Sequence, residues 1–173
     1  MISSAGEAAV SGVSLIDMFN NLIISVLAAL ATGGAVVTSQ FLGAGKKEDA
    51  CKSAKQLIVS SVCITIGISI LVMVFCNGII SLFFGKIEAD VFHNAVIYMM
   101  ISALSFPFLA LYNSCAALFR SMGNSQITLK VSVVENIINI GGNGLGVYVL
   151  GLGVAGVAIP SLISRAVAGF ILY

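Results

Sequence analysis

The sequence predicts an all-α membrane protein, a polytopic bundle of about five transmembrane helices. Of its 173 residues, 59% are hydrophobic and 9% are charged, and the mean hydropathy is +1.11. An average soluble domain is about 25% charged, so this chain has too few polar residues to cover a water-soluble domain. Apolar runs also recur along the chain, and each is long enough to cross about 30 Å of hydrocarbon as a helix.

Five apolar runs alternate with short polar connections. The approximate bounds of the runs are 8–42, 56–84, 91–119, 127–150 and 154–173. Gly43-Ala44-Gly45 is typical of a helix end, and Ser121-Met122-Gly123-Asn124-Ser125 is typical of a turn. No basic segment precedes the first run, so the sequence gives no sign of a secretory signal peptide.

The positions of Lys and Arg predict the orientation. The connections 43–55 and 120–130 together hold six basic residues, whereas the other two connections together hold one. Basic residues concentrate on the cytoplasmic side of membrane proteins. We therefore expect these two connections to be cytoplasmic, the N-terminus to be outside, and the protein to be a multi-pass protein of the plasma membrane.

One face of the run 127–150 is polar. Six residues fall within an arc of about 100° on a helix, and we call them the polar stripe: Thr128, Ser132, Glu135, Asn136, Asn139 and Asn143. A stripe of this kind in an apolar helix suggests a membrane segment that faces an aqueous cavity or the protein interior. It either lines a substrate or ion cavity, or its amides bond neighbouring helices.

Three ionisable residues lie within the predicted spans, namely Asp17, Glu135 and Arg165. Glu135 is about 12 Å from the cytoplasmic end of its helix, and Arg165 is about 17 Å from the outer end of the next, antiparallel helix. In a core of about 30 Å these depths nearly coincide. The depth count therefore predicts a structural ion pair between Glu135 and Arg165.

Asp17 begins a second, weaker polar face, which continues through Asn21. A carboxylate in a partly dry cavity can exchange protons or bind Na⁺. Alternatively, Asp17 is a carboxylate near a helix end that is hydrogen-bonded to its neighbours.

Pro107 lies near the middle of the run 91–119. It removes one backbone hydrogen bond and should kink the helix, either as a transport hinge or as a static packing feature. No hydrolase triad, phosphate loop or set of metal ligands is visible in the sequence. We therefore expect a protein that is not an enzyme and that needs no metal or organic cofactor, and the absence of a basic arm argues against nucleic acid as a partner.

Three stretches resemble the multidrug and toxic compound extrusion (MATE) family of secondary transporters. They are Thr38-Ser39-Gln40-Phe41-Leu42-Gly43-Ala44-Gly45; Ala117-Leu118-Phe119-Arg120-Ser121-Met122-Gly123-Asn124-Ser125; and Asn136-Ile137-Ile138-Asn139 with Gly153-Val154-Ala155-Gly156-Val157-Ala158-Ile159 and Ser164-Arg165. They span nearly the whole chain in the family's order.

The resemblance implies that the five spans are helices two to six of a twelve-helix, two-lobe transporter, so that residues 1–173 form part of the N-terminal lobe. Helix one, the end of helix six and the second lobe would lie outside this chain. Such transporters alternate access to a cleft between pseudo-symmetric halves. The family exports organic cations and other drugs in exchange for Na⁺ or H⁺, so membrane lipid, a cationic drug and the second lobe are the expected partners.

The resemblance also suggests a site. Asn139 and Asn143 would bond an ion, water or substrate, with Asn136 and Asn21 nearby, and Asp17 and Glu135 would favour cations. Many proton-coupled relatives have an acid where this chain has Asn143, and an apolar residue where it has Glu135. Two other functions remain as alternatives: a lipid-linked saccharide flippase of the same superfamily, and a small membrane scaffold or regulatory protein.

Overall fold

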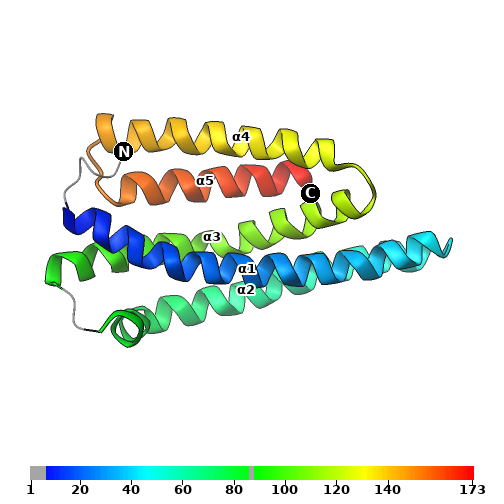
Figure 1. The fold of residues 1–173 in the computed structure, drawn as a ribbon, viewed down its shortest axis with the longest axis horizontal. Helices are drawn as coiled ribbons and strands as arrows, with labels where there is room; N and C mark the ends of the chain where they lie inside the picture. Colours follow the sequence, from blue (N-terminus) through cyan, green and yellow to red (C-terminus); the bar gives the residue numbers. More distant parts are fainter. Residues whose placement is uncertain (1–6, 86–87) are drawn as a thin grey trace.

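The computed structural model describes residues 7–85 and 88–173, and this part of the chain is a bundle of antiparallel helices (Figure 1). Its elements follow in order: α1 (Glu7–Gly43), α2 (Lys47–Phe84), α3 (Ala89–Ser121), α4 (Ser125–Gly144), a π-helical turn η2 (Leu145–Val149) and α5 (Ala155–Leu172). The all-α fold predicted from composition is therefore confirmed.

The helices α1 and α2 are longer than the apolar runs that predicted them. They have 37 and 38 residues, or about 55 Å each, and their hairpin projects beyond the turn between α3 and α4 (Figure 1). Helix α2 begins at Lys47 and runs through the polar stretch before residue 56, with Glu48 and Asp49 in its first turn. Acidic residues there stabilise the helix dipole, so the helix continues where the hydropathy falls.

Two glycines at positive φ close the turns at this end of the bundle. Gly45 has φ of 75°, and the next amide, of Lys46, donates to the carbonyl of Phe41 at 3.0 Å. Gly123 has φ of 79°, and the amide of Asn124 donates to the carbonyl of Phe119 at 2.9 Å. Both are bonds from a residue to the carbonyl five positions earlier, the pattern that ends many helices at glycine. The glycine-containing turns predicted from sequence are present.

Helix α3 is the centre of the bundle. It packs against α1, α2 and α5, whereas α4 packs mainly against α5, on the side away from α1 and α2 (Figure 1). Side chains around α3 form the main core, in which Ile16, Ile80, Met99 and Phe106 are almost completely buried. The α4–α5 pair is thus joined to the rest of the bundle chiefly through α3.

The outer surface of the bundle is apolar. Large hydrophobic side chains stay exposed along it, such as Val74 at 70% and Leu82 at 82%. Such a surface is unfavourable in water and suited to lipid. Within the described residues, four helices, α1, α2, α3 and α5, are long and apolar enough to cross a membrane. Helix α4 does not meet that criterion, because the polar stripe lowers its hydropathy.

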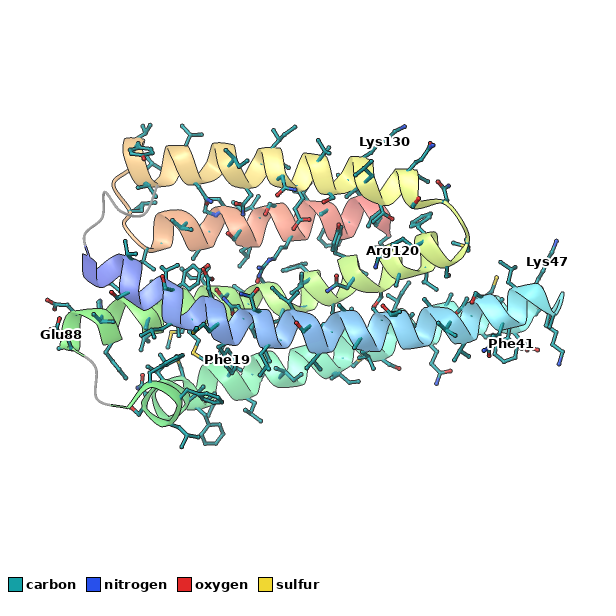
Figure 2. All side chains as sticks on the ribbon, viewed as in Figure 1. Phe19, Phe41, Lys47, Glu88, Arg120 and Lys130 are labelled. Carbon is teal, nitrogen blue, oxygen red and sulfur yellow. The ribbon has the colours of Figure 1, made fainter. Side chains whose placement is uncertain are left out.

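The basic residues of the two connections 43–55 and 120–130 lie together at one end. Lys47, Arg120 and Lys130 lie at the end where α1 joins α2 and α3 joins α4, and Glu88 lies at the opposite end (Figure 2). The two basic connections therefore lie at the same end of the bundle, and the cytoplasmic location of this end stays a prediction.

Candidate functional site

The part of the polar stripe toward the C-terminal end of α4 is hydrogen-bonded to α5. Asn139 donates from Nδ2 to Ser161 Oγ at 2.9 Å and to Ser164 Oγ at 3.5 Å. Asn143 donates from Nδ2 to Asn139 Oδ1 at 3.0 Å. The two amides and two hydroxyls therefore form one hydrogen-bonded chain, which we call the amide ladder. Because the ladder joins two helices, it stabilises the α4–α5 pair in addition to any role toward a ligand.

The amide ladder ends on a free acceptor. Asn143 Oδ1 is buried and accepts no hydrogen bond within the part of the chain that the structure describes. A buried amide oxygen without a donor is unfavourable by about 1–3 kcal/mol. A cation, a water molecule or a substrate donor at this oxygen would remove that penalty, so this atom is the strongest local indication of a ligand.

Close contact of α4 and the following turn η2 with α5 brings the ladder together. A Cβ on Gly142 would lie 2.6 Å from Pro160 Cβ, and a Cβ on Gly146 would collide with the carbonyl of Gly156. The helices therefore approach closely only because these positions lack side chains, as in other membrane helix pairs. Immediately after Asn143 the chain forms the π-helical turn η2, a local irregularity that is common at functional sites.

The part of the polar stripe toward the N-terminal end of α4 does not join the ladder. Asn136 donates from Nδ2 to the carbonyl of Ser132 on its own helix at 2.9 Å and is exposed. Thr128, which is buried, and Ser132 both line a cleft of about 410 Å³ between α3 and α4 at the basic end. The stripe that looks continuous in sequence is thus divided between two environments.

The charged residues gather on the inner side of α5. Arg165 donates from Nη1 to Ser105 Oγ of α3 at 2.7 Å. Tyr98, also on α3, donates its hydroxyl to Asp17 Oδ1 at 2.8 Å. Glu135 and Asp17 lie within electrostatic range of Arg165. We call these five residues the charge cluster, and they come from four helices.

The predicted ion pair between Glu135 and Arg165 is not a direct contact. In residues 7–85 and 88–173, the structure contains no salt bridge with an N–O distance of 4.0 Å or less for this pair. Arg165 instead donates to Ser105, and Glu135 is attracted to it over a longer distance. The depth count could not include a hydroxyl on α3 that competes for the guanidinium.

On α1, the prediction for Asn21 differs from what the structure shows. Asn21 is exposed on the outside of the helix, and its backbone carbonyl accepts a hydrogen bond from Ser25. The neighbouring Asn20 is only 4% exposed, and its Oδ1 has no partner among the described residues. Asp17, by contrast, is half-buried and bonded across to α3.

Sequence inspection missed the residues on α3 and α5 that complete these networks: Tyr98, Ser105, Ser161 and Ser164. Their spacing carries a signal, because Ser161, Ser164 and Arg165 share one face of α5 at intervals of three and four residues. Serine, however, is common in membrane helices as a packing residue. Only the position of the neighbouring helices separates the two roles.

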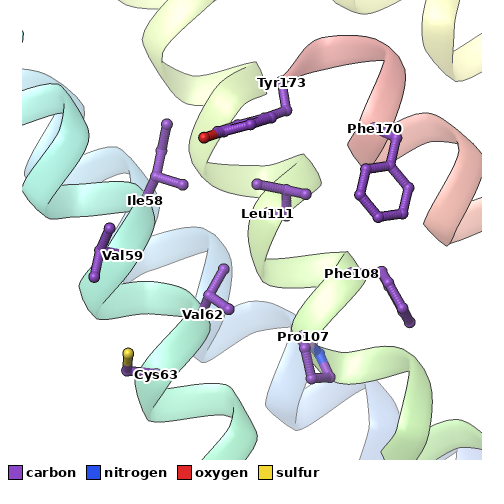
Figure 3. Close-up of a pocket in the computed structure, with 9 residues that line it drawn as sticks. All are labelled: Ile58, Val59, Val62, Cys63, Pro107, Phe108, Leu111, Phe170 and Tyr173. Carbon is purple, nitrogen blue, oxygen red and sulfur yellow. The ribbon is translucent and has the colours of Figure 1, made fainter.

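Pro107 belongs to neither network, although Ser105 of the charge cluster lies only two residues before it on α3. It is half-buried and lines an apolar crevice of about 380 Å³ between α2, α3 and α5, together with Phe108, Phe170 and Tyr173 (Figure 3). Helix α3 remains α-helical through it, from Ala89 to Ser121. The hinge role of Pro107 stays a prediction.

The chain also matches known proteins. The family model described as MatE matches residues 1–145. The chain belongs to the MatE family. This is a family of membrane transporters, as the resemblance in the sequence implied.

Among curated relatives of this MatE chain is the uncharacterized transporter YisQ of Bacillus subtilis (strain 168). It is 32% identical over 171 residues, which cover 96% of this chain and 37% of YisQ. The chain thus spans well under half the length of this relative.

Solved structures confirm the MATE fold. A MATE transporter in a bent conformation is 21% identical with a TM-score of 0.93, over 99% of this chain and 38% of its own. The outward-facing form of a multidrug resistance MATE transporter is 22% identical with a TM-score of 0.90, over 99% of this chain and 38% of its own. A superfamily member from Pyrococcus furiosus, described as having a binding pocket of reverse polarity, is also 22% identical with a TM-score of 0.90, over 99% of this chain and 37% of its own.

Proposed function

We propose that the protein containing this lobe is a secondary active antiporter of the plasma membrane that exports drugs or organic cations in exchange for Na⁺ or H⁺. The observation that carries the proposal is the amide ladder with its free acceptor, Asn143 Oδ1, inside a MatE-family helix bundle. Amide and hydroxyl oxygens are the ligands that hard cations such as Na⁺ prefer, and they also accept hydrogen bonds from protonated amines.

The charge cluster supports a cationic cargo. Asp17 and Glu135 supply two carboxylates against the single guanidinium of Arg165. Such an excess of negative charge in a low-dielectric interior attracts a cation more strongly than it would in water. A flippase for lipid-linked saccharides has to hold phosphate, and this balance of charge is unfavourable for that function.

The chemistry of the ladder distinguishes between Na⁺ and H⁺ as the coupling ion. The side chain of Asn143 cannot release or take up a proton, so the ladder can serve Na⁺ but cannot itself carry H⁺. Within this chain, proton coupling would therefore involve Asp17 or Glu135. We propose that these carboxylates act on the cation in transit and that Asn139 and Asn143 act at the ladder.

The test is drug susceptibility in efflux-deficient cells that express the complete gene. Asn143→Ala, Asp17→Asn and Glu135→Gln should each lower the protective effect, because each removes a ligand or a charge. Asn136→Ala is the matched control, since Asn136 lies on the same helix but bonds only its own backbone. Unchanged resistance in all three site variants, at equal protein levels, would contradict the proposal.

Coupling is measured on purified protein in vesicles. Export driven by an imposed Na⁺ gradient and lost in Asn143→Ala would support Na⁺ at the ladder. Export driven only by a pH gradient, retained in Asn143→Ala and lost in Asp17→Asn or Glu135→Gln, would place the coupling in the charge cluster instead.

A further inference from the structure

The position of Arg165 needs an explanation that the proposed function does not supply. It is the one charged residue of α5, and its guanidinium lies in the interior beside α3. A buried arginine is normally stabilised by a carboxylate that accepts two parallel hydrogen bonds. Here two carboxylates lie within electrostatic range, yet the guanidinium donates to the neutral hydroxyl of Ser105.

We propose that Arg165 is a tethered counter-cation, which shares the charge of Asp17 and Glu135 while the lobe is empty and which the transported organic cation replaces when it binds between them. This inference rests on the proposed function, because it assumes a cationic cargo. It adds that a fixed residue of the lobe competes with the cargo and thereby sets its affinity.

The arrangement of the charges supports the replacement. Asp17 is on α1, Glu135 is on α4 and Arg165 is on α5. With the two carboxylates and the guanidinium ionised, the cluster has a net charge of −1, so one further monovalent cation would neutralise it. The cluster therefore attracts a cation and at the same time repels it through Arg165.

The hydrogen bonds make the exchange feasible. A guanidinium held in a bidentate salt bridge would block the carboxylate oxygens that a cation needs. Because Ser105 holds Arg165 instead, no direct salt bridge covers Glu135 in the described part of the chain. Tyr98 donates to only one oxygen of Asp17, Oδ1, and that bond fixes the carboxylate without using its second oxygen.

A second observation indicates a ligand near Asp17. Asn20 lies one helical turn beyond Asp17 on the same helix, is 4% exposed, and has no partner for Oδ1 in the residues described. A buried amide oxygen next to a carboxylate on one helix is a further acceptor for a protonated amine or a metal cation. Together with Asp17 Oδ2 and the half-buried Glu135, it gives the cluster acceptors to which no described residue donates a hydrogen bond.

The experiment measures binding of tetraphenylphosphonium, a monovalent organic cation, to the purified protein expressed from its complete gene. Arg165→Gln should tighten binding by about tenfold, a typical size for coupling between sites, because it removes the competing charge. Glu135→Gln combined with Arg165→Gln should return the affinity to near the wild-type value, because the net charge is again −1. Ser105→Ala should weaken binding a fewfold, because it releases the guanidinium toward the carboxylates.

Lys130→Gln is the control, since it removes one positive charge from the same lobe at its exposed basic end. If Arg165→Gln unfolds, as judged by size-exclusion chromatography, the Ser105→Ala result still decides the question. Affinity that is unchanged or weaker in a folded Arg165→Gln, or unchanged in Ser105→Ala, overturns the inference. A wild-type protein that binds no tetraphenylphosphonium overturns it together with the proposed cationic cargo, so the two failures are distinguishable.

Discussion

The hydroxyl of Ser69 on α2 donates a hydrogen bond to the backbone carbonyl of Ala103 on α3. Ala103 lies four residues before Pro107, so its carbonyl is the one that loses its helical partner because proline has no N–H. In lipid such a carbonyl must find another donor, and neighbouring serines commonly supply it. Ser69 therefore allows Pro107 to occupy the middle of a central membrane helix.

Ser69→Ala should lower stability, because the carbonyl of Ala103 is then left without a donor. The expected loss is about 0.6–1.7 kcal/mol, the range measured for hydrogen bonds between membrane helices. In a Pro107→Ala background the loss should be smaller, because the amide of residue 107 again bonds Ala103. Thermal unfolding in detergent measures the stability of the wild type, the two single variants and the double variant. Ser60→Ala, at an exposed serine of the same helix, is the control. Equal losses in both backgrounds would show that Ser69 does not act on this carbonyl.

Asn139 and Asn143 should differ in their effect on stability. Asn139→Ala removes the bonds to Ser161 and Ser164 and the acceptor for Asn143, and it should cost about 1–2 kcal/mol. Asn143→Ala removes one bond but also an unpaired buried acceptor, so it should cost no more than about 0.6 kcal/mol while transport falls. Unfolding curves and vesicle transport measure the two effects. A larger stability loss for Asn143→Ala would contradict the ladder as described.

The backbone contact between η2 and α5 can be tested with one methyl group. Gly146→Ala should destabilise by about 1–3 kcal/mol, because its Cβ meets the carbonyl of Gly156, which cannot move without shifting α5. Gly141→Ala is the matched control, since nothing lies within 4 Å of its Cβ position. It should stabilise the helix by about 0.5–1 kcal/mol. Thermal unfolding of both variants separates close packing from general helix propensity.

Tyr98→Phe should lower drug resistance without removing any charge. The variant keeps the ring that packs in the core but loses the donor that fixes Asp17 Oδ1. We expect a stability loss of about 1 kcal/mol and weaker binding of the cation. Binding of tetraphenylphosphonium measures the effect, with Tyr148→Phe, on an exposed tyrosine of η2, as control. Equal affinity in wild type and Tyr98→Phe would rule out a positioning role for this hydroxyl.

Cysteine labelling checks the orientation. Cys51 and Cys63 are exposed, whereas Cys76 and Cys115 are buried. Cys51 lies in the basic, projecting part of α2, so a membrane-impermeant maleimide should label it from the cytoplasmic side only. Cys63 lines the apolar crevice and should resist that reagent, because lipid surrounds it. Labelling of Cys51 from outside intact cells would reverse the topology.

Much of the fold follows from the sequence because each signal is local. The apolar runs predict the helices, Gly45 and Gly123 mark their ends, and the clustering of Lys46, Arg120 and Lys130 indicates one face of the membrane. These features depend on backbone conformation and on transfer into lipid, which neighbouring residues along the chain decide. The family resemblance agrees with them over most of the chain.

The site depended on contacts between helices. The sequence placed Asn139, Asn143, Asp17 and Arg165 in membrane segments, where polar groups are rare and functional. It could not choose among their partners, because it does not say which serine or carboxylate on another helix lies within reach of the guanidinium. Only the tertiary structure decided that Arg165 bonds Ser105, that Asn139 bonds α5, and that Asn143 Oδ1 has no donor among the described residues. The physical reason is that these contacts depend on distances between helices. Those distances are set by the close approach to α5 that Gly142 and Gly146 allow, and by how α3 packs between the helices.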